Sequence, residues 1–213
     1  MLGRICWAEG RRIHLRQEQI LGVTCLTLAL PTREGGFERR LEKGCRLLRK
    51  RRVTRVLTPP GFPGWNILLQ HGLRPVDTVA LRCALAPAWV RATLQSIGIR
   101  PEQATVALSG ERESPDMVCV AKHLCPTVRR LVVSVPEDRG LAVLLRREFG
   151  LPVVPVHSTR ADVILRFDSG PVLNGARLTL RGETMPSNCE VLPLLSVLWE
   201  CGKVKTEEIT LTV

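Results

Sequence analysis

Four short apolar segments, with amphipathic helical segments between the first three, constrain the fold of this chain most strongly. They lie between Gln103 and Asp168 and cover Thr105–Leu108, Leu131–Val135, Pro152–Val156 and Ala161–Phe167. Strands that are apolar throughout are typical of a sheet buried on both faces, and strands that alternate with helices run parallel. We therefore expect an α/β protein whose main sheet is mostly parallel, with helices on both faces.

The helices between these strands carry clear start and stop signals. Ser114 is placed as an N-cap with Pro115 at the first helical position, a pairing that pre-organises a helix start. Ser134 and Glu137 have the spacing of a capping box, and Gly150 suits the end of the helix that follows.

The N-terminal part has a different pattern. Arg4–Ala8 and Arg12–Arg16 alternate around Glu9-Gly10, which predicts a β-hairpin. The apolar run Gly22–Leu30, the amphipathic run Phe37–Lys50 and the run Val53–Thr58 then predict a smaller βαβ portion.

Two helical runs connect this portion to the central strands. We expect them at Thr78–Cys83 and Pro87–Ile97, with the boundary between the two portions near Ile99. The expected division is therefore residues 1–99 and 100–213.

The C-terminal part is expected to contain the strand Ala176–Arg181, a helix around Cys189–Cys201 and the strand Glu208–Val213. Before them, Asn174-Gly175 predicts a hairpin turn, in preference to a ligand contact by Asn174.

The order of strands and helices in the central segment resembles the Rossmann-type nucleotide-binding family. The layout is similar to the cofactor half of shikimate-dehydrogenase-like and glutamyl-tRNA-reductase-like proteins. The G-x-G-x-x-G of that family would fall at Gly110–Pro115, where only Gly110 matches. The missing glycines normally let backbone N–H groups approach a pyrophosphate, so NAD(P) is disfavoured and the cofactor is left unassigned.

The resemblance still implies a ligand edge at the carboxyl ends of the strands. Arg112 and the start of the next helix could hold a phosphate, opposed by Glu111, and Glu137 or Asp138 could bind a ribose. His157 could act as a general base, but a polar turn is favoured, and no catalytic residue is assigned. The candidate ligand-binding residues are Gly110, Glu111, Arg112, Ser114, Glu137, His157 and Ser158.

The Pro/Gly-rich loop Thr58–Gly64 follows a strand in the N-terminal portion. It suits either the close approach of a ligand to the backbone or a tight turn from strand to helix, and the residues alone favour neither.

The net charge is +11, and the helical run Phe37–Lys50 has a strongly basic outer face. Such a face would contact nucleic-acid phosphates. An ordinary solvated face is favoured, because no recognition helix or exposed aromatic group accompanies it.

None of the eight cysteines forms a C-x-x-C pair. Cys119 and His123 are four residues apart, but a metal site would need further ligands, and none is expected. No apolar leader opens the chain and no apolar run of about 18 residues occurs, so we expect a cytoplasmic protein without a membrane span.

The expected function is binding of a nucleotide or another phosphorylated small molecule in a cleft between the two portions. One alternative is a non-enzymatic regulatory or interaction module whose cofactor loop has decayed. The other is nucleic-acid binding through the basic helix face. The residues predict neither an enzymatic activity nor an oligomeric state.

Overall fold

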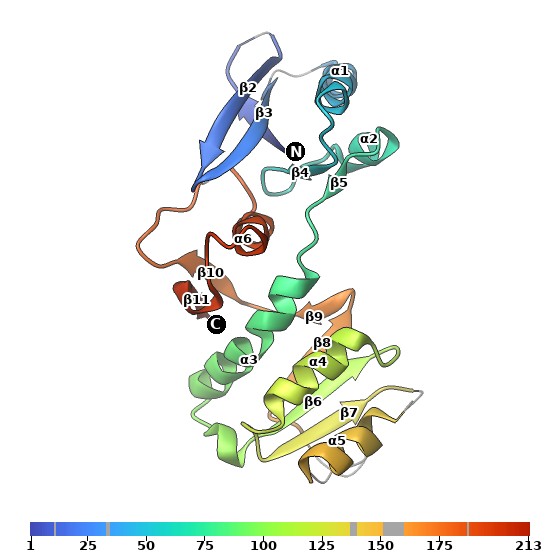
Figure 1. The fold of residues 1–213 in the computed structure, drawn as a ribbon, viewed down its shortest axis with the longest axis vertical. Coiled ribbons are helices and arrows are strands. Elements are labelled where there is room, and N and C mark those ends of the chain that lie inside the picture. The colour runs from blue at the N-terminus through green and yellow to red at the C-terminus, as the bar shows by residue number, and fades with distance from the viewer. Residues whose placement is uncertain (11, 33–34, 137–139, 151–159, 187) are drawn as a thin grey trace. The chain divides into compact units, whose positions relative to one another are not determined.

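The computed structural model describes residues 1–10, 12–32, 35–136, 140–150, 160–186 and 188–213. The chain forms two compact units (Figure 1). The first consists of Met1–Thr78 and Leu180–Glu208, and the second of Val79–Thr179 and Ile209–Val213. The chain thus leaves the first unit after Thr78, returns to it at Leu180 and leaves it again after Glu208. The helix that follows Thr78 belongs to the second unit.

The first unit is built on a five-stranded sheet of order β2-β3-β1-β4-β5. β1 runs parallel to β3 and β4, β5 runs parallel to β4, and β2 runs antiparallel to β3. The strands are β1 (Leu2–Ala8), β2 (His14–Ile20), β3 (Val23–Pro31), β4 (Arg55–Leu57) and β5 (Arg74–Pro75).

The predicted hairpin between the first two strands is wrong. β2 pairs with β3 through the two-residue turn Leu21-Gly22, and β3 lies between β2 and β1. Leu21 has φ 47° and Gly22 has φ 78°, and two left-handed residues give the turn that matches the twist of a hairpin. β1 is buried from Gly3 to Cys6 and takes a central position between two parallel neighbours.

The predicted βαβ unit is confirmed. The helix α1 (Phe37–Lys50) connects the parallel strands β3 and β4, with β1 between them. α1 and the short helix α2 (Trp65–Gln70) pack on one face of the sheet. Their buried core consists of Ile5, Leu26, Leu28, Leu30, Leu41, Cys45, Leu48, Val53, Val56, Phe62, Leu68 and Leu73.

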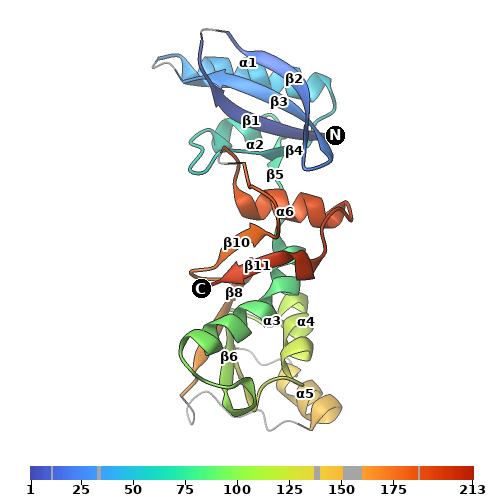
Figure 2. The same ribbon diagram turned by 90° about the vertical axis from the view of Figure 1, so that its left-hand side faces the viewer.

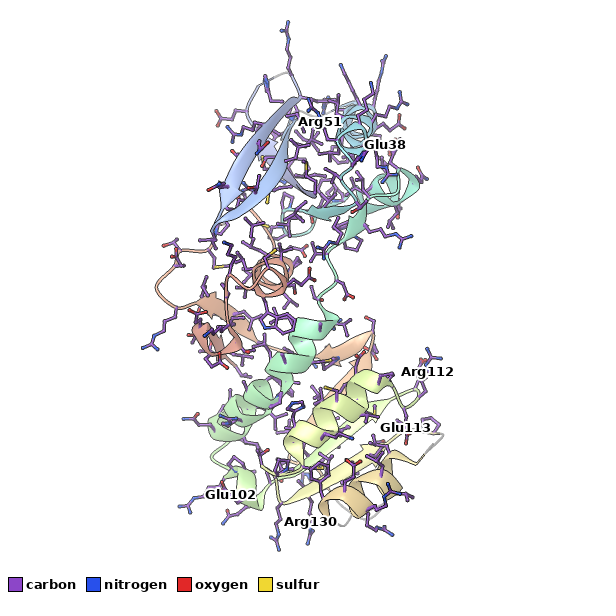
Figure 3. The ribbon with its side chains drawn as sticks, in the orientation of Figure 1. Glu38, Arg51, Glu102, Arg112, Glu113 and Arg130 are labelled. Carbon is purple, nitrogen blue, oxygen red and sulfur yellow. The ribbon has the colours of Figure 1, made fainter. Side chains whose placement is uncertain are left out.

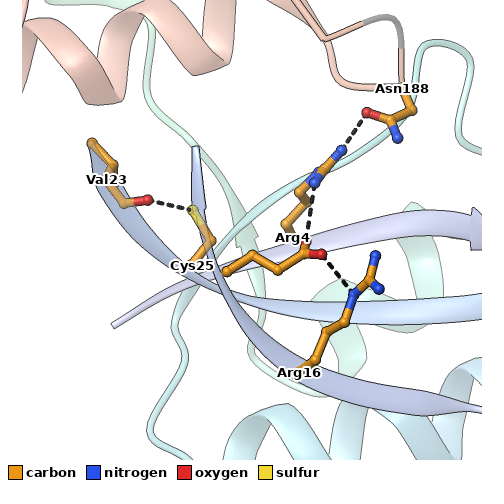
Figure 4. Close-up of polar contacts among 6 residues, drawn as sticks. Arg4, Arg16, Val23, Cys25 and Asn188 are labelled. Atoms are coloured by element: carbon orange, nitrogen blue, oxygen red, sulfur yellow. Dashed lines mark hydrogen bonds and ion pairs between the residues drawn. The ribbon is translucent and has the colours of Figure 1, made fainter. Parts of the chain in front are cut away.

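The helix α6 (Val191–Glu200) and the residues before it also belong to the first unit, where Glu200 forms an ion pair with Arg55 of β4 at 2.6 Å. Arg4 of β1, only 8% exposed, donates to Glu18 of β2 at 3.2 Å and to Asn188 (Figure 4). Arg16 adds an ion pair to Glu18 at 2.6 Å. A buried guanidinium with these partners ties the edge of the sheet to the segment that leads into α6.

The second unit contains a four-stranded sheet of order β7-β6-β8-β9. β6 is parallel to both β7 and β8, and β9 is antiparallel to β8. These strands are β6 (Thr105–Gly110), β7 (Arg130–Ser134), β8 (Val163–Asp168) and β9 (Gly170–Val172), and β10 (Arg177–Leu180) with β11 (Ile209–Thr212) forms a separate pair. The predicted α/β class with mostly parallel sheets is confirmed, whereas the strand expected at Pro152–Val156 lies outside the described residues.

Three helices contribute to the core of the second unit (Figure 2): α3 (Val79–Ser96), α4 (Pro115–Leu124) and α5 (Leu141–Phe149). Short 3-10 turns occur at Pro101–Gln103 and Thr206–Glu208. The largest buried groups around the sheet include Trp89, Leu94, Leu108, Met117, Leu131, Leu145, Leu165 and Phe167. Among the described residues, no helix is both long and apolar enough to cross a membrane.

α3 is one helix in the place of the two that the sequence predicted, Thr78–Cys83 and Pro87–Ile97. It runs without a break through Pro87. A proline inside a helix costs about 3 kcal/mol, but Leu85, Ala86, Trp89 and Val90 on both sides of it are buried in the core or next to it. Burial of these side chains offsets the cost and keeps the helix continuous.

The capping box predicted at Ser134 is wrong. Ser134 ends β7, and α5 begins seven residues later at Leu141 with Gly140 as its N-cap. Glu137 itself lies outside the described residues. The predicted end of this helix at Gly150 is confirmed, with φ 65°.

The hairpin predicted at Asn174-Gly175 is also wrong. The two residues form a turn, but the strands on either side, β9 and β10, belong to different sheets. The Asn174 carbonyl accepts a hydrogen bond from Trp89 Nε1 at 3.0 Å. A hydrogen bond to α3 therefore fixes the turn, and pairing of the adjacent strands with each other does not.

Candidate functional site

A cavity of about 660 Å³ lies at the carboxyl ends of β6 and β8 in the second unit. From β6 the chain continues through α4 to β7 on one side, while β8 occupies the other side. Open α/β sheets bind ligands at such a switch point, where the strand order reverses and the chain goes to opposite sides of two neighbouring parallel strands. The cavity is lined by Val79, Glu111, Arg112, Ser114, Pro115, Asp116, Phe167, Asp168, Ser169 and Gly170.

The start of α4 forms one wall, and its N-cap is as the sequence predicted. Ser114 Oγ accepts a hydrogen bond from the Met117 N–H at 3.1 Å, and Pro115 is the first helical residue. Asp116 adds a carboxylate to the first turn. Ser114 already accepts one of the free N–H groups of the first turn, and Pro115 has none. Asp116 also offsets the positive end of the helix dipole. This N-terminus can therefore donate few hydrogen bonds to a phosphate and attracts it weakly.

Gly110, the last residue of β6, is not among the residues that line the cavity. A Cβ at this position would be 2.9 Å from the Phe167 carbonyl oxygen and 3.1 Å from Met117 Cε. Glycine is thus required for β6 to lie close to both β8 and α4. Its ligand-binding role remains a prediction.

The loop after β6 carries charges of both signs (Figure 3). Glu111 and Arg112 are exposed and line the cavity. Glu113 is engaged elsewhere, since its Oε1 accepts the Leu141 N–H at 3.0 Å, at the start of α5. Of the residues that the structure describes, three carboxylates, those of Glu111, Asp116 and Asp168, and one guanidinium line the cavity.

The turn between β8 and β9 forms the opposite wall and is held by α3. Arg82 Nη1 donates to the Pro171 carbonyl at 3.0 Å, and Nη2 donates to that of Ser169. Gly170 has φ 85°, and a Cβ there would be 2.8 Å from Val79 Cγ1. Arg82 thus positions Ser169 and Gly170 at the cavity.

Sequence reasoning missed Val79, Arg82 and the residues of the β8–β9 turn. Arg82 and Ser169 are 87 positions apart, and no local pattern connects them. Asp168 gave a usable signal, because it is the last residue of β8, whose carboxyl end lies beside that of β6.

The ligand-binding roles of three other candidates remain predictions. Glu137, His157 and Ser158 lie outside the described residues. Asp162 has a structural role, since its Oδ2 accepts the Thr105 N–H at 2.8 Å and its own N–H donates to the Thr105 carbonyl at 2.9 Å.

Cys119 and His123 lie close to one another on α4. His123 Nδ1 is 2.8 Å from the Cys119 carbonyl and 4.0 Å from its Sγ. Within the described ranges, no three His, Cys, Asp or Glu residues gather as metal ligands. Nearby, burial raises the pKa of the Cys83 thiol to about 11, with smaller contributions from Asp116 and Cys119.

In the first unit, the loop after β4 packs against aromatic side chains. Phe62 is buried, with its ring centroid 5.6 Å from that of Trp7, 6.1 Å from that of Phe37 and 6.3 Å from that of Trp65. The loop thus closes one end of the apolar core, which favours the structural interpretation of Thr58–Gly64.

Comparison with known proteins gives only a distant likeness. No family model matches the chain, and no curated protein matches it. Among solved structures, it is similar to L-tryptophan dehydrogenase from Nostoc punctiforme, with 18% identity and a TM-score of 0.36, over 68% of this chain and 44% of that one. The chain spans less than half the length of that enzyme, and a likeness at this level supports no functional assignment.

Proposed function

We propose that the protein binds a nucleoside or nucleotide in the cavity at the carboxyl ends of β6 and β8, recognising its ribose hydroxyls. The observation that carries this proposal is the cavity of about 660 Å³ at the switch point, lined by three carboxylates and one arginine. Ligand cavities in proteins commonly measure about 300–1,000 Å³ and are found at this place in open α/β sheets.

Hydroxyl recognition follows from the chemistry of the lining. Carboxylates accept hydrogen bonds and cannot donate them, so Glu111, Asp116 and Asp168 favour ligand groups that donate. The two hydroxyls of a ribose are such donors, and acidic side chains bind them in nucleotide-binding sheets. Asp116 and Asp168 come from opposite walls of the cavity, so a ribose between them would meet an acceptor on each side.

A phosphate contributes less than the hydroxyls in this proposal. Among the described residues, Arg112 is the only cationic one in the lining, and it is exposed. A phosphate next to Arg112 would gain one charged contact and be repelled by the neighbouring carboxylates. We therefore expect a phosphorylated ligand to place its phosphate near Arg112, with little gain in affinity over the nucleoside.

The test compares four ribonucleosides with their 2′,3′-dideoxy analogues and 5′-monophosphates, by thermal shift and by titration calorimetry. At least one ribonucleoside should bind ten times more tightly than its dideoxy analogue, because a carboxylate left without its donor costs about 1–3 kcal/mol. The monophosphate should bind within about threefold of the nucleoside. NAD serves as a probe of the pyrophosphate mode and should bind no more tightly than adenosine.

Two variants locate the binding. Asp168→Asn should weaken ribonucleoside binding about tenfold, whereas Glu102→Gln, which removes an exposed carboxylate outside the cavity lining, should leave it unchanged. No binding of any ribonucleoside, or equal binding of the dideoxy analogues, would rule out the proposed mode.

A further inference from the structure

The outer face of α1 carries a continuous row of cations. Arg39, Lys43, Arg46 and Lys50 are spaced i, i+4, i+7 and i+11, which places them within about 60° of one another around the helix. All four are exposed. The row is about 16 Å long at a rise of about 1.5 Å per residue, and it lies opposite the buried stripe of Leu41, Cys45 and Leu48.

The basic charge continues beyond the end of the helix. From Arg39 to Arg52 the sequence has eight basic residues and a single acidic one. Figure 3 marks Glu38 in the first turn of α1 and Arg51 directly after its last residue. Arg52 has φ 58°, a left-handed conformation that costs a residue other than glycine roughly 1 kcal/mol. Arg52 therefore has a backbone conformation in which a glycine would be less strained.

Helix stability does not explain this row. Cations stabilise the last turn of a helix, where Arg49 and Lys50 lie, and destabilise the first turn. Arg39 lies in the first turn of α1, where a cation acts against the helix dipole, and Lys43 lies beyond that turn. The helix dipole therefore favours neither Arg39 nor Lys43.

Little of this charge is neutralised within the first unit. Arg46 lies 3.8 Å from Glu42, a weak and exposed pair. Across the ranges that the structure describes, Arg39, Lys43 and Lys50 form no ion pair. The row is therefore available to an external anion.

We propose that this face of α1 binds the phosphate backbone of a nucleic acid. Six of the eight basic residues from Arg39 to Arg52 are arginine, whose planar guanidinium group binds phosphate oxygens in pairs. A linear row of cations on a rigid helix matches a linear polyanion, and each neutralised phosphate releases counterions. This binding is separate from the nucleoside site of the second unit.

An anionic membrane fits this face less well. Helices that lie on membranes insert their apolar side into the lipid, and the apolar side of α1 is occupied by the core of the first unit, with Leu41, Cys45 and Leu48 all 0% exposed. Contact with lipid would thus be electrostatic only.

The experiment measures binding of the full chain to a labelled 20-nucleotide single-stranded RNA and to a duplex DNA, between 50 and 300 mM salt. The test variant is Arg39→Gln/Lys43→Gln/Arg46→Gln. The control variant, Arg129→Gln/Arg146→Gln/Arg147→Gln, removes the same charge from exposed positions of the second unit. Circular dichroism confirms that both remain folded.

The test variant should lose at least tenfold in affinity at low salt, because three cations of the row are removed. Its slope of log K against log salt should become shallower by about 2. The control variant should keep the slope and lose less than threefold. Equal losses in both variants would show attraction by net charge alone and overturn the proposal. Binding to phosphatidylserine/phosphatidylcholine vesicles without binding to either nucleic acid would overturn it as well.

Discussion

At the scale of single residues, Gly110 and Arg82 fix the positions of the elements around the cavity. Gly110 has no space for a side chain, because the Phe167 carbonyl and Met117 lie against it. Arg82 secures the facing turn through two backbone carbonyls. Both residues shape the cavity without lining it.

Gly110→Ala should lower the free energy of unfolding by about 1–2 kcal/mol, because the added methyl group overpacks the junction of β6, β8 and α4. The measurement is urea denaturation, with Ser109→Ala as the control at the preceding, half-buried position. Unchanged stability of Gly110→Ala would contradict the close packing described here.

The cysteines give a second prediction at this scale. Burial is the main cause that raises the pKa of six thiols, and five of them reach about 11, against an ordinary value of 9.0: Cys25, Cys45, Cys83, Cys125 and Cys189. At pH 8, two thiols of the folded chain, those of the exposed Cys119 and Cys201, should react quickly with a colorimetric thiol reagent. In denaturant, all eight should react. Rapid reaction of more than two in the folded protein would contradict the burial of the others.

The same thiols predict the response of stability to pH. The unfolded chain loses these protons near pH 9, while the folded chain keeps them until about pH 11. The free energy of unfolding should therefore fall as the pH rises from 9 to 11. Urea denaturation across this range checks the direction, and a rise in stability would contradict it.

At the scale of elements, local signals predicted the helices well and the strand partners poorly. The Ser114 cap and the buried stripe of α1 follow from residues close together in the chain, and both are confirmed. The pairing of β2 with β3 and the continuity of α3 depend on contacts between distant residues. Such contacts leave no local pattern, which is also why the role of Arg82 was missed.

Pro87 tests the account of α3. Pro87→Ala should raise the free energy of unfolding by about 1–3 kcal/mol, because alanine restores a helical N–H and removes a steric conflict. Pro101→Ala, at the first position of a 3-10 turn, is the matched control and should bring no gain, since proline suits that position. A loss of stability in Pro87→Ala would mean that packing of its ring outweighs the helix effect.

At the scale of the whole molecule, each unit has its own apolar core. Leu28 belongs to the core of the first unit and Leu108 to that of the second, and both are 0% exposed. Replacing either by alanine should cost about 2–5 kcal/mol. We expect two transitions in a calorimetric scan, with Leu28→Ala lowering one and Leu108→Ala lowering the other. A single transition lowered equally by both variants would show that the units unfold together.

This assignment of transitions makes possible the most direct test of nucleoside binding in the second unit. A ribonucleoside at about 100 times its dissociation constant should add about 2.7 kcal/mol to the stability of the unit that binds it. The measurement is a calorimetric scan of the wild-type chain with and without that ribonucleoside. We predict that the transition lowered by Leu108→Ala moves to higher temperature while the other stays in place. A shift of only the transition that Leu28→Ala lowers would contradict the assignment of the cavity as the binding site. A scan in which neither transition shifts would contradict it as well.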